Sequence, residues 1–322
     1  MLSSLFTSNN KVAHSDVGEQ FKPATFSPDR IELKQIRQKL RNHFRKVKQL
    51  GNRASAKYKF SQIGGSNKNL LLQQREAVVD ELIEKLNTVS CSNELKNLVS
   101  DSIREGIDCF LDKHKEVFHD DLYYWNDDML HRSDRLYYLR GLSKIIHNMA
   151  SQKLGVEIYP AHVFDYEEGP IVNEEGISTI GYGYCTWHLQ KDLGQFIGIN
   201  FHPDISQLDG LTNLKVLLHE IGHSIHAQTG HIVLFDYDKL TPEQKERMEP
   251  FLADGAYVIE LQRQNAVVSA SVSLKAYKSS ACERLARTGQ EHVIIIEEQF
   301  ERQMGRTLPD MIAERKDQPH FM

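Results

Sequence analysis

Few features of this sequence would support covalent cross-linking or membrane insertion. Its four cysteines are widely spaced and form no CxxC pair, so neither a disulfide framework nor a cysteine-built zinc site is expected. No apolar run approaches the roughly 18 residues that a transmembrane helix requires. The N-terminal residues lack the basic and long apolar segments of a cleaved secretory signal. We therefore expect a cytoplasmic protein, or one that is exported without a cleaved signal peptide.

The sequence also lacks a strong excess of one charge. The formal net charge is −5 for 322 residues, which gives no general electrostatic reason to bind nucleic acid. A hydrophobic content of 40% and a charged content of 26% are typical of a soluble protein with an ordinary core. The length is sufficient for one large domain or for two smaller ones.

Apolar periodicity predicts an α+β fold that is predominantly α. Apolar residues recur at helical spacing before Gly155, which suits a helix C-terminus. Short β-branched and aromatic segments between residues 156 and 203 predict a small sheet. Helical spacing resumes after it, with a loop expected at residues 229–244. The expected organisation is a flexible lead over 1–27, a helical N-terminal region over 28–155, a region of strands and helices over 156–310 and a tail over 311–322.

The first expected helix, within residues 28–50, has a strongly basic polar face. Ser27 is placed to cap this helix, and Pro28 suits its first turn. One acidic residue, Glu32, accompanies the basic residues Lys34, Arg37, Lys39, Arg41, Arg45, Lys46 and Lys48. Such a face is ordinarily a solvated surface that acidic helices balance elsewhere. It can also attract an anionic membrane surface or an acidic partner.

The stretch LLHEIGHSIHAQTG, residues 217–230, places histidines and a glutamate among core-like residues. His219 and His223 are four positions apart, so a helix puts them about 40° apart on one face, where two imidazoles can bind one zinc ion. Glu220 lies about 100° round the helix from His219, where it can reach a water on the metal. Zinc would lower the pKa of that water, and the carboxylate would take its proton. This HExxH arrangement fits peptide hydrolysis.

Gly222 lies inside this expected helix, where glycine costs about 1 kcal/mol relative to alanine. Its presence predicts that another backbone approaches the helix closely, or that space is kept beside the metal.

The segment HEIGHSIH has the form HExGHxxH and resembles the zincin metallopeptidases, in particular the thimet-type oligopeptidases and related gluzincins. The resemblance is local and covers the motif helix and the preceding strand, IGINF. It implies that residues 156–310 form a zincin-like metallopeptidase region in which a small sheet precedes the HExxH helix. It also implies one Zn2+ ion as the cofactor.

A catalytic zinc site requires a third protein ligand, which in gluzincins is a glutamate on a later helix. Asp254 is the single charged residue of PFLADGAYVI, and a carboxylate in apolar surroundings is costly unless it binds a metal or is otherwise paired. We therefore expect Asp254 to be the third ligand, or to orient a zinc-bound histidine. Glu249 is the alternative, because its spacing of 26 from His223 is nearer the oligopeptidase pattern. Glu260 is a more distant candidate. If Asp254 has no role at the metal, the alternative is that it forms a buried salt bridge with an arginine or lysine.

Other residues near the motif allow several roles. His226, one turn after His223, either packs in the core or lies beside the metal site. The strand QFIGINF is a candidate edge strand that would bind an extended substrate by strand addition. The candidate donors to the oxyanion that forms during hydrolysis are Tyr182, Tyr184, His231 and Tyr257.

The sequence therefore predicts a zinc-dependent peptidase in which Glu220 is the general base and acid and the substrate is a peptide or protein. A housekeeping peptidase and a dedicated, toxin- or effector-like proteinase both fit. The alternative is a non-catalytic adaptor that binds a membrane or partner through the basic helix within 28–50, with a structural zinc site.

Overall fold

Helices form most of the described chain, as the apolar periodicity predicted, and the strands form one three-stranded sheet and one two-stranded pair. The computed structural model describes residues 29–63, 67–114, 117–125, 130–165, 171–172, 178–179, 183–190, 194–201, 209–255 and 273–317. The expected lead over 1–27 and the expected cap at Ser27 and Pro28 lie outside these ranges. The longer helices are α2 (Asp29–Ile63), α3 (Lys68–Asn87), α4 (Asn93–His114), α6 (Arg132–Leu154), α7 (Gly210–His231), α11 (Ala281–Gln290), α12 (Val293–Met304) and α13 (Leu308–Asp317). The shorter ones are α5 (Phe118–Tyr123), α8 (Pro242–Met248) and α10 (Leu274–Lys278).

The strands all lie in the segment where the sequence predicted them. The main sheet has the order β1-β5-β4, in which β1 pairs parallel and β4 antiparallel to the central strand. These strands are β1 (His162–Asp165), β4 (Gly183–Gln190) and β5 (Gly194–Phe201). A separate antiparallel pair comprises β2 (Ile171–Val172) and β3 (Ser178–Thr179). Since QFIGINF belongs to the central strand β5, the prediction that it is an edge strand is wrong; β4 lies at an edge instead.

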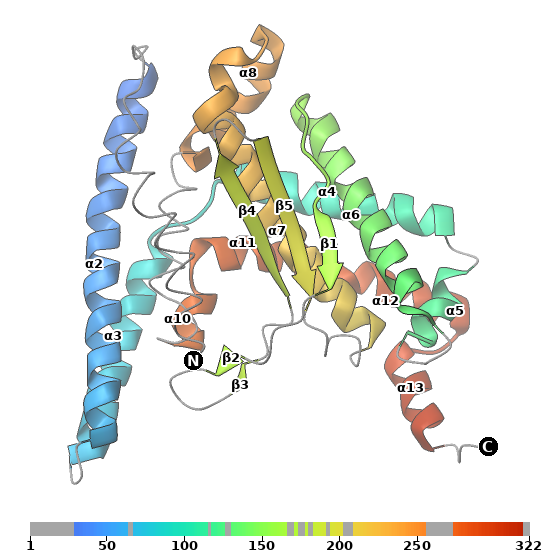
Figure 1. The fold of residues 1–322 in the computed structure, drawn as a ribbon, viewed down its shortest axis with the longest axis horizontal. Helices are drawn as coiled ribbons and strands as arrows, with labels where there is room; N and C mark the ends of the chain where they lie inside the picture. The colour runs from blue at the N-terminus through green and yellow to red at the C-terminus, as the bar shows by residue number, and fades with distance from the viewer. Residues whose placement is uncertain are drawn as a thin grey trace.

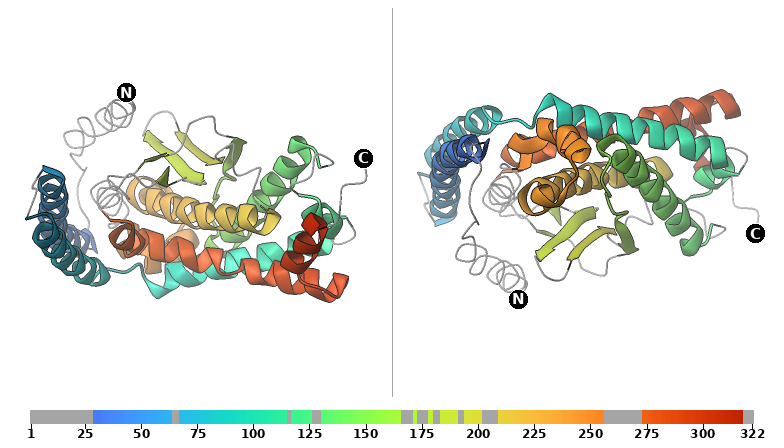
Figure 2. Two further views of the ribbon diagram at one scale, coloured as in Figure 1. Left: turned by 90° about the horizontal axis from the view of Figure 1, so that it is seen from below. Right: turned by 90° about the horizontal axis from the view of Figure 1, so that it is seen from above.

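The motif helix α7 lies at the centre of the fold. The sheet covers one side of it, and α4 and α11 cover the opposite side (Figure 2). Asp209 caps the start of α7, since its carboxylate accepts a hydrogen bond from the Thr212 backbone N–H at 2.8 Å. A helix enclosed from several directions must be apolar around most of its circumference, and this explains why the motif is set among leucines and isoleucines.

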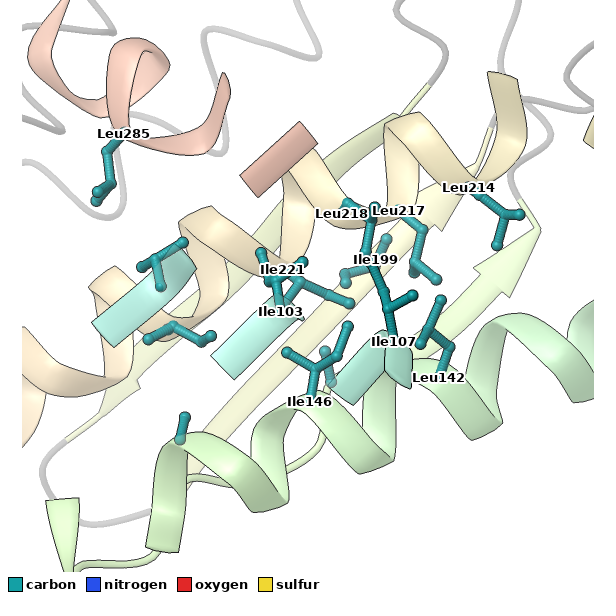
Figure 3. Close-up of a cluster of buried hydrophobic side chains, with 14 of the residues drawn as sticks. Ile103, Ile107, Leu142, Ile146, Ile199, Leu214, Leu217, Leu218, Ile221 and Leu285 are labelled. Carbon is teal, nitrogen blue, oxygen red and sulfur yellow. The ribbon is translucent and has the colours of Figure 1, made fainter. Parts of the chain in front are cut away.

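The main core joins α7 to helices from both ends of the chain. Its side chains are fully or almost fully buried, and each buried valine, leucine, isoleucine or phenylalanine contributes about 1.5–3 kcal/mol relative to exposure. Figure 3 shows the part of this core around α7, with Ile103, Ile107, Leu142, Ile146, Ile199, Leu214, Leu217, Leu218, Ile221 and Leu285 labelled. Residues before and after position 155 therefore contribute to one cluster of buried side chains.

Helices α2 and α3 lie side by side as a hairpin at one side of the molecule (Figure 1). A second buried cluster holds this hairpin together, and it consists of Val47, Leu50, Ala54, Val78, Val79, Leu82, Leu86 and Ala276. Leu40 and Phe44, nearer the start of α2, belong to the main core instead. The end of the hairpin, near Ile63 and Lys68, projects away from the sheet and α7 (Figure 1).

Two segments are more helical than the sequence suggested. Residues 229–244, expected as a loop, continue from α7 into a π-helical turn (Ile232–Asp236) and a 3-10 turn (Tyr237–Lys239), and α8 then begins. Thr241 and Gln244 form a capping box at the start of α8. Residues 311–317 of the expected tail lie in α13. In the described part of the chain, no helix is long and apolar enough to cross a membrane.

A buried polar network connects α7 to α6 and to the segment before β1. Nδ1 of His147 lies 2.7 Å from the Ser143 carbonyl oxygen, and its Nε2 lies 2.8 Å from the Ser224 hydroxyl. A carbonyl can only accept, so Nδ1 carries the proton and Nε2 accepts from Ser224. The Gln228 amide pairs with both backbone groups of Tyr159, at 2.7 and 2.9 Å. Burial lowers the pKa of His147 to about 4, although its bond to Ser143 opposes that shift.

We predict that His147 makes folding stability depend on pH. Because folding lowers its pKa from 6.5 to about 4, the neutral ring contributes full stability above pH 6.5. This contribution, about 3 kcal/mol, is lost as the pH falls from 6.5 towards 4. Urea unfolding of the wild type and of His147→Gln at pH 7.5 and pH 4.5 measures the effect. The variant should be less stable at pH 7.5 but should lose less on acidification, and an equal loss in both proteins would contradict the prediction.

Candidate metal centre

Three side chains converge on one point between α7 and α11. The Nε2 atoms of His219 and His223 lie 3.2 Å apart. The two carboxylate oxygens of Glu283 lie 3.3 Å from them, Oε2 from His219 and Oε1 from His223. These three residues form the metal-competent group found in the described part of the chain. The sequence predicted the two histidines and missed Glu283.

The separations within this group match the donor spacing of a tetrahedral zinc site. Donors about 2.0–2.1 Å from a zinc ion at tetrahedral angles are about 3.3–3.4 Å apart. Two imidazole nitrogens and a carboxylate are also a donor set that zinc commonly takes. The histidine side chains remain 18% and 17% exposed, which leaves the group accessible to solvent, whereas Glu283 is 5% exposed. The residues therefore fit a zinc ion.

The electrostatics of the group favour a positive charge at this point. Burial alone would raise the pKa of the Glu283 carboxyl, but the charge of His223 and polar contacts with both histidines hold it well below its usual range. Burial opposes charging of His223, yet the Glu283 and Glu220 carboxylates raise its pKa to about 9. In addition, Oε1 of Glu283 is buried and has no hydrogen bond of ordinary geometry to the described residues. A buried carboxylate is stabilised by positive charge beside it, which a protonated His223 or a metal ion would supply.

Close packing of α7 and α11 brings Glu283 to the histidines. A Cβ atom at Gly222 would lie 3.0 Å from Cα of Ala286, and one at Gly289 would lie 3.0 Å from the Leu218 carbonyl oxygen. Because each glycine lacks a side chain, the backbone of the other helix can pass close to it. The prediction from Gly222 that another backbone approaches the motif helix closely is confirmed.

Glu220 is buried, with 6% of its surface exposed. Burial raises the pKa of its carboxyl group, and the nearby Glu283 adds to the increase. His219, His223 and a hydrogen bond from the Cys185 backbone on β4 oppose it. A carboxylate with a raised pKa, held beside the two histidines, is suited to accept a proton and to return it. The Cys185 thiol stays protonated, since burial and the Glu220 charge raise its pKa.

Tyr277, on α10, is a further member of the site that the sequence did not indicate. Burial raises the pKa of its hydroxyl far above 10, and the charge of Glu283, a hydrogen bond to that carboxylate and the charge of Glu220 add to the increase. Its hydroxyl therefore remains a neutral hydrogen-bond donor beside the metal-competent group.

The structure places Asp254 and Glu249 outside this group. Asp254 is buried as predicted, but its Oδ1 accepts from the Ser92 N–H at 2.9 Å and its Oδ2 accepts from the Ser92 hydroxyl at 2.5 Å. Ser92 Oγ in turn accepts from the Leu95 N–H and caps the start of α4. The buried Asp254 carboxylate is therefore stabilised by hydrogen bonds from Ser92, the residue that caps α4. Glu249 is exposed at the end of α8.

The sequence also offered other residues as a third ligand, as oxyanion donors or as a neighbour of the metal, and only some of them are described by the structure. Glu260, Tyr182 and Tyr257, together with the side chain of Tyr184, lie outside the described residues. His231 lies 3.3 Å from Asp236 beyond the motif. His226 is buried, and burial together with the charge of His223 lowers its pKa to about 3, so it is a neutral packing residue.

The local sequence around Glu283 explains why its role was not apparent. Ser280 and Glu283 have the S-x-x-E spacing of a capping box, which ordinarily indicates no more than a helix start. Ser280 does accept a hydrogen bond from the Glu283 N–H, but the carboxylate is directed to His219 and His223. One local feature of the sequence does suggest that Glu283 is buried. Glu283 lies among the buried small and apolar residues Cys282, Leu285, Ala286 and Gly289.

No family model, curated protein or solved structure matches this chain. The function of the site must therefore be argued from the geometry of its own residues.

We predict that Glu283 is required for zinc binding and that Asp254 is not. Removing a residue that orients a ligand weakens metal affinity 10- to 100-fold, so Glu283→Ala should weaken zinc binding by at least that factor. Asp254→Ala should retain one zinc per chain but lose about 1–3 kcal/mol of stability, because Ser92 loses its acceptor. Elemental mass spectrometry after dialysis against zinc buffers measures the first effect, and urea unfolding measures the second. Glu249→Ala is the matched surface control. Zinc lost from Asp254→Ala but retained by Glu283→Ala would reverse the assignment.

The Gly222 contact leads to a separate prediction. In Gly222→Ala the new methyl group would lie 3.0 Å from the α11 backbone, so the two helices must separate by a few tenths of an ångström. We expect zinc affinity to fall about tenfold, as it does when a residue that orients a metal ligand is removed. In Gly141→Ala, within α6, the new Cβ would lie 3.7 Å from Phe110, an ordinary contact. This control should keep its zinc affinity and gain up to about 1 kcal/mol of stability. Chelator competition gives both affinities, and equal affinities would show that the close approach is unimportant for the site.

Proposed function

We propose that this protein is a zinc-dependent peptidase of the HExxH type. The observation that carries the proposal is the convergence of His219, His223 and Glu283 at zinc-like donor spacing, with the buried Glu220 beside them. His219, His223 and Glu283 would hold the ion. This assignment keeps the zincin-like interpretation of the motif helix and replaces the expected third ligand.

When bound, zinc would lower the pKa of a water molecule and polarise the carbonyl of the bond to be cleaved. Glu220 would take a proton from the attacking water as the water oxygen bonds to the carbonyl carbon, and it would give that proton to the leaving amine as the C–N bond breaks. The Cys185 backbone N–H holds the Glu220 carboxylate in position for both transfers. Tyr277 donates its one hydroxyl proton to the Glu283 carboxylate and would thereby hold this ligand in position.

An extended peptide is the substrate form that this arrangement favours. Strand β4 lies at an edge of the sheet, and its Cys185 backbone donates to Glu220. A substrate backbone added alongside β4 would therefore run past the proposed general base. The edge strand that we propose for substrate binding is thus β4 in place of β5.

Glu220→Gln is the test of the proposal. We expect one zinc per chain in this variant, because Glu220 is not a ligand, and a loss of hydrolysis of about 10²–10⁴-fold, because an amide cannot take the proton. The measurement combines elemental analysis with mass spectrometry of a diverse peptide library incubated with each protein. Asp254→Asn is the control for a buried acid outside the site, and it should cleave the same bonds as the wild type.

Two results would contradict the proposal. One is cleavage that is unchanged in Glu220→Gln, and the other is zinc binding without zinc-dependent cleavage of any peptide in the library. The second result would favour the alternative, in which the metal stabilises the fold of an adaptor protein.

A further inference from the structure

The far end of the α2–α3 hairpin combines exposed apolar side chains with positive charge. Three of its large apolar residues are more than half exposed: Phe60 at 62%, Ile63 at 82% and Leu70 at 54%. Phe60 and Ile63 are three positions apart on α2, so they share one face of that helix, and Leu70 lies in the first turn of α3. Large apolar side chains that cluster at one exposed place indicate an interaction surface. We call Phe60, Ile63 and Leu70 the apolar tip.

The surroundings of the apolar tip are positively charged. Between Glu32 and Glu76 the sequence contains twelve lysines and arginines and no aspartate or glutamate. Lys59 and Lys68, which flank the tip in the sequence, are exposed. Helix α2 has eleven basic and two acidic residues, whereas the whole chain has 39 basic and 44 acidic ones. The positive charge is thus concentrated in the hairpin of an acidic protein.

The position of the tip suits contact with an extended surface. The hairpin projects from one side of the molecule, and its end lies away from the sheet and α7 (Figure 1). A flat surface could therefore meet the tip without contacting the metal-competent group. Lys57 donates from α2 to Gln74 on α3 at 2.7 Å, which joins the two helices near this end.

We propose that the apolar tip and its flanking lysines bind the surface of an anionic phospholipid bilayer. Phe60, Ile63 and Leu70 insert into the boundary between headgroups and acyl chains, and Lys59 and Lys68 lie at the level of the anionic headgroups. A bilayer fits better than a folded acidic protein, because the three apolar side chains form a small projecting end and the charge continues along α2 behind it. This inference does not depend on the peptidase activity.

Binding of the full-length protein to lipid vesicles tests the inference. Sedimentation is measured with vesicles of phosphatidylcholine and with vesicles containing 30% phosphatidylserine. The wild type should bind the anionic vesicles at least tenfold more tightly, and binding should weaken as NaCl is raised from 50 to 500 mM. Phe60→Ser/Ile63→Ser should reduce binding at least tenfold. Lys59→Glu/Lys68→Glu should reduce it at least 25-fold, since each lysine near an anionic surface is worth about fivefold.

The matched control is Ile294→Ser on α12, which replaces another exposed isoleucine, 48% exposed, far from the hairpin in the sequence. It should bind vesicles within twofold of the wild type. Both tip variants should cleave soluble peptides at the wild-type rate, so failure of vesicle binding and failure of the proposed peptidase activity are distinguishable. Equal binding to neutral and anionic vesicles, or unchanged binding by the tip variants, would overturn the inference. Absence of binding to either vesicle would also overturn it.

Discussion

The candidate metal centre depends on how closely α11 approaches α7. Gly222 meets the Ala286 backbone, and Gly289 meets the Leu218 carbonyl, so the two helices pass without side chains between them at these points. This approach allows the short Glu283 side chain to reach both histidines. The position of Glu283 in the first turn of α11 adds a favourable term, because the positive end of the helix dipole stabilises a carboxylate there. The lower helix propensity of Gly222 is therefore offset by the close packing of α7 against α11, which brings Glu283 to the histidines.

Other contacts hold α7 from its remaining sides. His147 bonds Ser224 from α6, Gln228 pairs with the Tyr159 backbone before β1, and the Cys185 backbone on β4 donates to Glu220. Each polar group of α7 named here therefore has a specific partner on a different neighbouring element, which makes its burial tolerable. The same contacts fix the rotation of the helix about its axis. That rotation determines that His219 and His223 are directed to α11 and that Glu220 lies by the sheet edge.

The distribution of charge divides the molecule into two parts with different chemistry. The body around α7 contains buried ionisable groups whose pKa values are strongly shifted by burial and by one another. The α2–α3 hairpin instead carries exposed charge of predominantly one sign along α2 and exposed apolar side chains at its end. Buried charges support chemistry at one point, whereas exposed charges act over a surface and are sensitive to salt. The two proposed roles, hydrolysis of a peptide and binding to a surface, would therefore lie at separate places in the chain.

The sequence by itself determined the features that depend on neighbours along the chain. Helical spacing identified the motif helix and put His219 and His223 on one face, strand composition located the small sheet, and Gly222 indicated a close backbone contact. Burial of Asp254 was also evident from its apolar neighbours. The tertiary structure alone decided which carboxylate meets the histidines, because Glu283 lies 60 positions after His223 and its local pattern is that of a helix cap. It likewise decided that β5 is central and that Asp254 bonds Ser92, since strand order and the pairing of buried polar groups depend on segments far apart in the chain.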